Sequence, residues 1–167
     1  RRQLWFWLLA LVIGIFAGVA AMGFRLAIEG LQSALYGTDD VALLHSHVAT
    51  LAWYWILLIP AAGGIVVGAI MTRFTRDGQV RSVADVIEAA ALRDARIDRG
   101  PGIASFIASW ITLSTGGSSG REGPVVHFAS LISSWIADRI RADGITGRDL
   151  LGCAVAAAVS ASFNAPI

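Results

Sequence analysis

One window of the sequence, residues 114–124, holds the side chains most able to do chemistry. Arg121 and Glu122 are adjacent there, with glycines on both sides and a Ser- and Gly-rich stretch before them. Apolar runs precede and follow the window, so the charged pair interrupts a hydrophobic context. Ionised groups in such a setting are costly to desolvate, which marks Glu122 as a candidate ion or proton site.

A helix is predicted to begin at Pro124, with Gly123 as its cap, because proline lacks an N–H that the first turn would not use. The unpaired N–H groups from Val125 and Val126 onward would then point toward the Gly-rich loop, where the helix dipole favours an anion. Glycines in that loop let a second backbone approach closely. The candidate anion-binding residues are Gly120, Arg121, Gly123, Pro124, Val125 and Val126, although Arg121 fits a structural role better.

Glu122 is predicted to be a gate, because its carboxylate can occupy the electropositive position that an anion would occupy. The ionised form competes with the anion, and the protonated form can withdraw. Desolvation raises the pKa of Glu122, whereas Arg121 and the helix terminus lower it, so the sign of the net shift stays open. The structural alternative is a carboxylate at a helix start, paired with Arg121 or Arg148.

Two other classes of protein are considered. The stretch 116–120 matches G-x-S-x-G, and its second half matches the G-x-S-G of rhomboid-type intramembrane hydrolases, with Ser118 or Ser119 as nucleophile. A hydrolase elbow needs a strand before the Ser and a later His, and no His follows His127. We therefore expect no enzyme; a non-catalytic membrane subunit is the other alternative. His127 itself fits a hydrogen-bonded packing residue, with proton relay as the second interpretation.

Composition indicates a bilayer as the solvent. Mean hydropathy is +0.66, 56% of the 167 residues are hydrophobic and 15% are charged, against about 25% charged in soluble domains. The net charge of +1, with Arg scattered among carboxylates, argues against a nucleic-acid partner. The single Cys153 excludes a disulfide within the chain and Cys-based metal sites, and we expect no metal or other cofactor.

Two long apolar segments predict membrane-spanning helices at 4–35 and 49–73, since 4–24 and 41–72 carry no Asp, Glu, Lys or Arg. Each contains a GxxxG pattern, Gly14/Gly18 and Gly64/Gly68, which is either a close-packing groove or a chance match. Later helices are shorter, at 82–94, 102–116, 124–139 and 148–160. Short membrane helices must be buried in protein or line a wet cavity. We expect an all-α membrane fold with tilted and re-entrant helices.

Charge placement predicts the orientation. Arg1, Arg2, Arg73, Arg76 and Arg81 flank one side of the two spans, whereas the connection on the other side holds Asp39 and Asp40. Positive residues mark the cytoplasmic side, so we expect a multi-pass protein of a bacterial inner or plasma membrane with a cytoplasmic N-terminus. The chain opens without Met and stops inside an expected helix, so we expect it to be part of a longer protein.

Gly120-Arg-Glu-Gly-Pro124 resembles the GREGP signature of CLC anion channels and transporters, and 161–167, ASFNAPI, resembles the family's A-x-F-N-A-P segment. The resemblance implies that 1–167 is the truncated N-terminal repeat of an inverted-repeat CLC transmembrane domain. It further implies a homodimer that moves chloride by default, gated at Glu122, as a voltage-gated-type channel or a Cl⁻/H⁺ antiporter. The second anion-coordinating helix start, a conducting Tyr and an inner proton Glu would follow Ile167.

One departure from the family concerns the inner anion site. Where the family has Gly-Ser-Gly-Ile-Pro, this sequence reads Val-Arg-Ser-Val-Ala-Asp over 80–85. Arg81 and Ser82 are therefore a possible inner anion site, or Arg81 simply belongs to the cytoplasmic excess of Arg.

Overall fold

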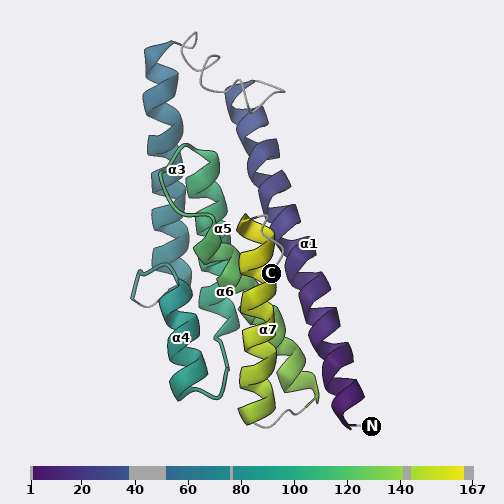
Figure 1. Cartoon of the computed structure of the whole chain (residues 1–167). Helices are drawn as coiled ribbons and strands as arrows, with labels where there is room; N and C mark the ends of the chain where they lie inside the picture. Colours follow the sequence, from purple (N-terminus) through teal and green to yellow (C-terminus); the bar gives the residue numbers. More distant parts are fainter. Residues whose placement is uncertain (1, 38–51, 76, 141–143, 164–167) are drawn as a thin grey trace.

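The computed structural model describes residues 2–37, 52–75, 77–140 and 144–163. All regular secondary structure in these ranges is helical: α1 (Arg2–Tyr36), α3 (Trp53–Phe74), α4 (Val83–Leu92), α5 (Arg99–Ser114), α6 (Glu122–Ile140) and α7 (Gly144–Phe163). The expected all-α class is confirmed. Figure 1 shows α5 and α6 between the two long helices α1 and α3, with α7 against the lower half of α1.

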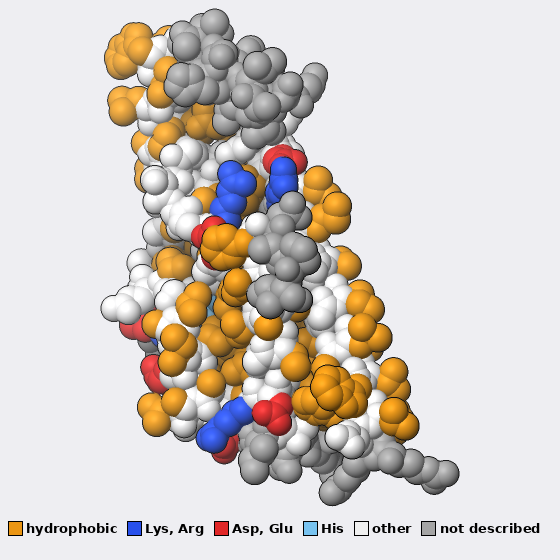
Figure 2. Space-filling model, in the orientation of Figure 1, with side chains coloured by type: hydrophobic (Ala, Val, Ile, Leu, Met, Phe, Trp, Pro, Cys, Tyr) orange, Lys and Arg blue, Asp and Glu red, His pale blue; other side chains and the backbone are white. Residues whose placement is uncertain are grey.

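Helices α1 and α3 are long and apolar enough to cross a membrane. Both keep large hydrophobic side chains exposed: Trp5 is 68% exposed on α1 and Ile65 is 75% exposed on α3. Figure 2 shows apolar side chains over much of the length of one face, with few charged groups among them. Such faces are unfavourable in water and suit a hydrocarbon environment or further protein.

The core lies where α1, α6 and α7 meet. Along α1 the buried residues recur at helical spacing: Ile13, Ala17, Ala21, Phe24 and Ile28. Leu150, Ala154 and Ala158 of α7 lie four residues apart and share one buried face with them. Small side chains at these positions allow the close helix approach on which membrane helix packing depends. This core holds the beginning of α6 in place, because Val125, Val126 and Ala129 belong to it.

Close helix contact occurs at a glycine other than the four in the GxxxG patterns. A Cβ placed on Gly63 of α3 would lie 2.7 Å from the Cβ of Thr115, the residue that ends α5. At Gly14, Gly18, Gly64 and Gly68 no described atom lies within 4 Å of such a Cβ. Within the described residues the two patterns are therefore not contact grooves, and Gly63 is the point of close approach.

The helix bounds differ from the expected ranges where charged residues or glycines occur. α4 ends at Leu92 rather than 94, because Asp94 and Ala95 adopt left-handed backbone angles, with φ of 48° and 63°. α5 begins at Arg99 and α7 at Gly144, both earlier than expected. The charged residues 93–98 form the connection between α4 and α5. An ion pair joins this connection to α7, from Asp94 to Arg148 at 3.2 Å, and another joins the start of α5 to α6, from Arg99 to Asp138 at 2.9 Å.

Candidate functional site

The Gly-rich loop begins with a tight reversal at the end of α5. Gly116 has φ of 93°, and the Gly117 N–H donates to the carbonyl of Thr112 at 2.8 Å. A glycine in the left-handed region, followed by a 6→1 hydrogen bond such as this one from Gly117 to Thr112, is a Schellman motif. A Cβ on Gly117 would lie 2.5 Å from Thr112 Cγ2. Both glycines are therefore required for the chain to turn back toward α6.

Helix α1 anchors this reversal through two polar side chains. Tyr36 Oη donates to the carbonyl of Thr115 at 3.2 Å, and Gln32 Nε2 donates to the carbonyl of Leu113 at 3.2 Å. The last carbonyls of a helix lack helical partners, so these bonds satisfy groups that would otherwise be orphaned. Tyr36 is only 7% exposed. The end of α1 thus fixes the position of the loop.

Helix α6 begins at Glu122, two residues before the predicted start. The prediction of Gly123 as cap was therefore wrong, although Pro124 still lies in the first turn, where it removes no helical hydrogen bond. With this start, the N–H groups of Val125 and Val126 can bond carbonyls one turn back. Because Pro124 has no N–H, the amides without helical partners are then those of Arg121, Glu122 and Gly123. Glu122 is itself part of the helix terminus.

The Glu122 carboxylate folds back over the loop. Its Oε2 lies 3.0 Å from the position that a Cβ on Gly120 would occupy. Glu122 is half-buried and Arg121 is exposed. Over the described part of the chain neither of them forms an ion pair, and Arg148 is paired with Asp94 instead. The carboxylate therefore lies beside a helix N-terminus without a fixed cationic partner.

The wall behind this helix start is rigid and apolar. The side chains of Val125 and Val126 are buried, Val126 to 2% exposure, in the core against α1 and α7. They serve to hold the first turn of α6, whereas the polar groups of the site are backbone amides and the Glu122 carboxylate. A fixed set of amides beside a movable carboxylate is an arrangement that can accept either that carboxylate or a small anion.

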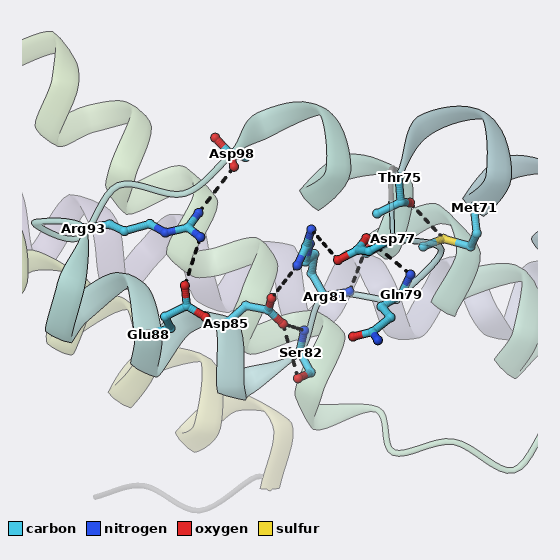
Figure 3. Close-up of polar contacts among 11 residues, drawn as sticks. Met71, Thr75, Asp77, Gln79, Arg81, Ser82, Asp85, Glu88, Arg93 and Asp98 are labelled. Atoms are coloured by element: carbon cyan, nitrogen blue, oxygen red, sulfur yellow. Dashed lines mark hydrogen bonds and ion pairs between the residues drawn. The ribbon is translucent and has the colours of Figure 1, made fainter.

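Arg81 and Ser82, the possible inner anion site, belong to a local network at the start of α4 (Figure 3). The Arg81 guanidinium pairs with Asp77 at 3.1 Å and with Asp85 at 3.0 Å. The Ser82 N–H donates to Asp85 Oδ2 at 2.7 Å, while the Ala84 N–H donates to Ser82 Oγ at 3.3 Å. This reciprocal arrangement is a capping box. An anion at Arg81 would compete with two carboxylates, which argues against the inner site.

The network also sets the charge states of its members. Burial raises the pKa of the Asp85 carboxyl, but the hydrogen bonds from the Ser82 backbone and from Arg81 outweigh it, and the net pKa lies below its ordinary value. The hydrogen bond to Asp85 raises the pKa of Arg81. Both groups stay ionised at neutral pH, so the ion pair between Arg81 and Asp85 persists there and stabilises the start of α4.

The serines of the loop are not paired with a base. Ser118 and Ser119 are exposed, whereas His127 is 2% exposed and packs toward α5, where a Cβ on Gly102 would lie 3.0 Å from its Cε1. The Nε2 atom of His127 has no hydrogen-bond partner among the described residues. A nucleophile and base in hydrogen-bond contact, as a serine hydrolase requires, do not occur in this arrangement.

Sequence reasoning missed the residues that support the loop from a distance. Gln32 and Tyr36 lie about eighty positions before their partners, and only the polar character of Tyr36 at the end of an apolar helix could have indicated a buried contact. It also missed Asp77 and Asp85 as partners of Arg81, although their four-residue spacing on each side was a usable signal. The second motif, at 161–167, lies largely outside the described residues.

Comparison with known proteins identifies the family of this chain. Residues 63–167 match the family model described as voltage gated chloride channel. The voltage-gated ClC-type chloride channel ClcB of Citrobacter koseri is 30% identical over 165 residues, which cover 96% of this chain and 38% of the relative. ClcB of Escherichia coli K12 has the same identity and coverage. A putative chloride channel protein ClcB-like of Ralstonia nicotianae is 29% identical over 160 residues, 93% of this chain and 37% of the relative. No solved structure matches.

The described residues form an all-helical segment in which two helices are long and apolar enough to cross a membrane. The chain belongs to the voltage-gated chloride channel (CLC) family, because the family model covers more than half of its residues. It spans less than two fifths of the length of the curated relatives it matches.

Proposed function

We propose that this chain forms one half of an anion pathway in which Glu122 is the gate. The observation that carries the proposal is the Glu122 carboxylate at the first turn of α6, folded over Gly120 and free of ion pairs over the described residues. The transported ion is a small inorganic anion, with chloride as the default, as the names of the relatives indicate for those proteins. Family membership supports this reading.

The proposed mechanism is competition for one helix terminus. The N–H groups of Glu122 and Gly123 carry partial positive charge that stabilises either the carboxylate or an anion. Protonation of Glu122 removes its charge and its attraction to these amides, so the side chain withdraws and an anion enters. The Gly-rich loop leaves room for this movement, since a Cβ at Gly120 would already touch the carboxylate.

The test uses the full-length protein reconstituted in liposomes loaded with chloride, with anion flux and proton movement measured together. Replacing the gate, Glu122→Gln or Glu122→Ala, should abolish proton coupling in an antiporter or leave a channel constitutively open. Glu29→Gln is the control, because it also removes a carboxylate charge, but from a side chain that is paired with Arg25 on α1 at 2.9 Å. A Glu122→Ala protein whose anion flux and proton coupling equal those of the parent would refute the proposal.

The same experiment separates the two modes of transport. Uphill proton movement driven by a chloride gradient identifies a Cl⁻/H⁺ antiporter, whereas chloride flux without proton movement identifies a channel. Substituting chloride by fluoride or nitrate in the same liposomes identifies the preferred anion.

Assembly and orientation are part of the proposal. We expect a homodimer of the full-length protein, measured as the mass of the purified complex by light scattering in detergent. We expect the N-terminus on the cytoplasmic side, because Arg73 and Arg81 follow the second span whereas Asp39 and Asp40 precede it. A reporter fused at the N-terminus that is active only in the cytoplasm tests this orientation.

A further inference from the structure

A small polar pocket lies between α4, the connection after it, and α6. Its volume is about 30 Å³, which is enough for a water molecule, since one water needs roughly 10–15 Å³. The imidazole of His127 lines it from α6. This pocket is separate from the Gly-rich loop and takes no part in the gating proposed above.

His127 is the unusual member of the pocket. It is 2% exposed, and its Nε2 atom has no hydrogen-bond partner among the described residues. A buried polar atom left without a partner costs about 1–3 kcal/mol, so native structures satisfy such atoms with protein or water. The ring cannot turn away toward α5, because it already fills the space that a side chain at Gly102 would need. A water in the pocket is the available partner.

The charges around the pocket are balanced. Arg81, Asp85 and Glu88 line it from α4 and the residue before the helix, and Arg93, Arg96 and Asp98 line it from the connection. Three positive groups thus face three negative ones. Five of these groups are paired with one another: Arg81 with Asp85 at 3.0 Å, and Arg93 with Glu88 at 2.9 Å and with Asp98 at 3.5 Å (Figure 3). Helix α5 meets the ring at Gly102, which has no titratable group.

Balanced and paired charges do not select an anion, because each cation already has a carboxylate partner. Burial lowers the pKa of the His127 imidazole, and the positive charge of Arg81 lowers it as well, whereas the Asp85 carboxylate raises it. The pocket therefore permits one additional proton, on the ring, once the pH falls below the ordinary histidine pKa. We propose that this pocket is a hydrated proton-binding site in which His127 is the proton acceptor. This site is additional to Glu122 and does not depend on Glu122 acting as a gate.

The proton transfer balances within the pocket. A hydronium ion that reaches the pocket water gives its proton to the Nε2 lone pair, which forms an N–H bond and leaves water behind. The imidazolium then donates that N–H to the same water and returns the proton when the pH rises. Asp85, whose pKa lies below its ordinary value, remains ionised in both states, and its negative charge favours the protonated ring.

The test is nitrogen-15 histidine NMR on the full-length protein in detergent, labelled at histidine. The signal that disappears in His127→Gln belongs to this ring. We expect it to titrate reversibly with a midpoint below the ordinary histidine pKa of about 6.5, because burial lowers the pKa of the ring. Removing a pocket carboxylate, by Asp85→Asn or by Glu88→Gln, should lower its midpoint by about one pH unit. Glu88→Gln does not disturb the capping box, so it remains informative if Asp85→Asn fails to fold.

The matched control is Asp138→Asn, which removes a carboxylate of the same helix outside the pocket and should leave the midpoint unchanged. Chloride is varied at constant ionic strength to separate the occupants. A midpoint independent of chloride supports water and proton as the ligands, and a midpoint that rises with chloride would make the pocket an anion site and overturn the proposal. A ring that stays neutral throughout, or that ignores Glu88→Gln, would overturn it as well.

Discussion

Glu122 and Asp85 are both carboxylates in the first turn of a helix, but their surroundings assign them different tasks. Asp85 accepts hydrogen bonds from the Ser82 backbone and from Arg81, at 2.7 and 3.0 Å. Glu122 has no ion pair over the described ranges, and its Oε2 lies beside Gly120, 3.0 Å from where a Cβ there would be. A carboxylate held by two donors is structural, whereas one that lies free at a helix N-terminus can leave it. Position in the helix alone does not distinguish the two.

This contrast predicts that Asp85→Asn and Glu122→Gln differ in their effect on the free energy of unfolding. Asp85→Asn should lower the free energy of unfolding by about 1 kcal/mol, the usual loss for a helix cap, because the amide has no charge to pair with Arg81 and a single oxygen where two now accept hydrogen bonds. Glu122→Gln should leave stability within the error of the measurement. Thermal unfolding of the full-length protein in detergent at neutral pH compares them. Equal loss in both variants would show that Glu122 is also held structurally.

The stabilisation by Asp85 should depend on pH in a defined direction. Its pKa in the folded protein lies below the ordinary value, so its contribution is present above the ordinary carboxyl pKa of about 3.9 and is lost as pH falls through the folded pKa. The difference in unfolding temperature between the parent and Asp85→Asn should therefore be constant near neutrality and shrink below about pH 4. A difference that grew on acidification would contradict the lowered pKa.

At the level of the elements, the contact of α3 with the end of α5 depends on a single glycine. Gly63→Ala would place a methyl group 2.7 Å from the Cβ and Cγ2 of Thr115, so the two helices must separate. Overpacking of this kind costs about 1–3 kcal/mol. Gly64→Ala is the matched control, since no described atom lies within 4 Å of its Cβ. Thermal unfolding of both variants should show loss for Gly63→Ala alone.

The same contact bears on the loop, because Thr115 immediately precedes Gly116. If α3 shifts, the carbonyl of Thr115 moves away from Tyr36, which donates to it at 3.2 Å. Gly63→Ala should therefore also change anion flux in liposomes, whereas Gly64→Ala should not. Parent-like stability and flux in Gly63→Ala would mean that the helices are not closely packed at this point.

The sequence predicted the fold class and the loop that carries Glu122, because both depend on local patterns. Runs without charge indicate the long helices, and Gly, Pro and a lone carboxylate between apolar runs indicate the site. It predicted the ends of α4, α5 and α7 less well. Asp94 and Ala95 take left-handed angles that tertiary contacts impose, and the supports of the loop at Gln32 and Tyr36 are contacts between distant parts of the chain. Such contacts leave no local pattern to read.

For the whole molecule, the exposed apolar faces of α1 and α3 imply an environment that the described helices do not supply. Ile65 lies in the middle of α3 and is 75% exposed, whereas Leu92 is 78% exposed at the end of the short helix α4. In water the two positions would be equivalent. In a bilayer Ile65 meets hydrocarbon or further protein, and a charge there is costly.

Substituting arginine at Ile65 and, separately, at Leu92 tests whether α3 is surrounded by a bilayer or by water. Ile65→Arg should reduce membrane insertion of α3, by about 2.5–3.5 kcal/mol if it lies near the centre of the bilayer. Leu92→Arg should have little effect, because α4 is too short to span and its end carries charged neighbours already. The measurement is the fraction of full-length protein that resists alkaline extraction from membranes. Equal extraction of both variants would mean that α3 does not cross the hydrocarbon core, and that its exposed face is covered by protein outside the bilayer.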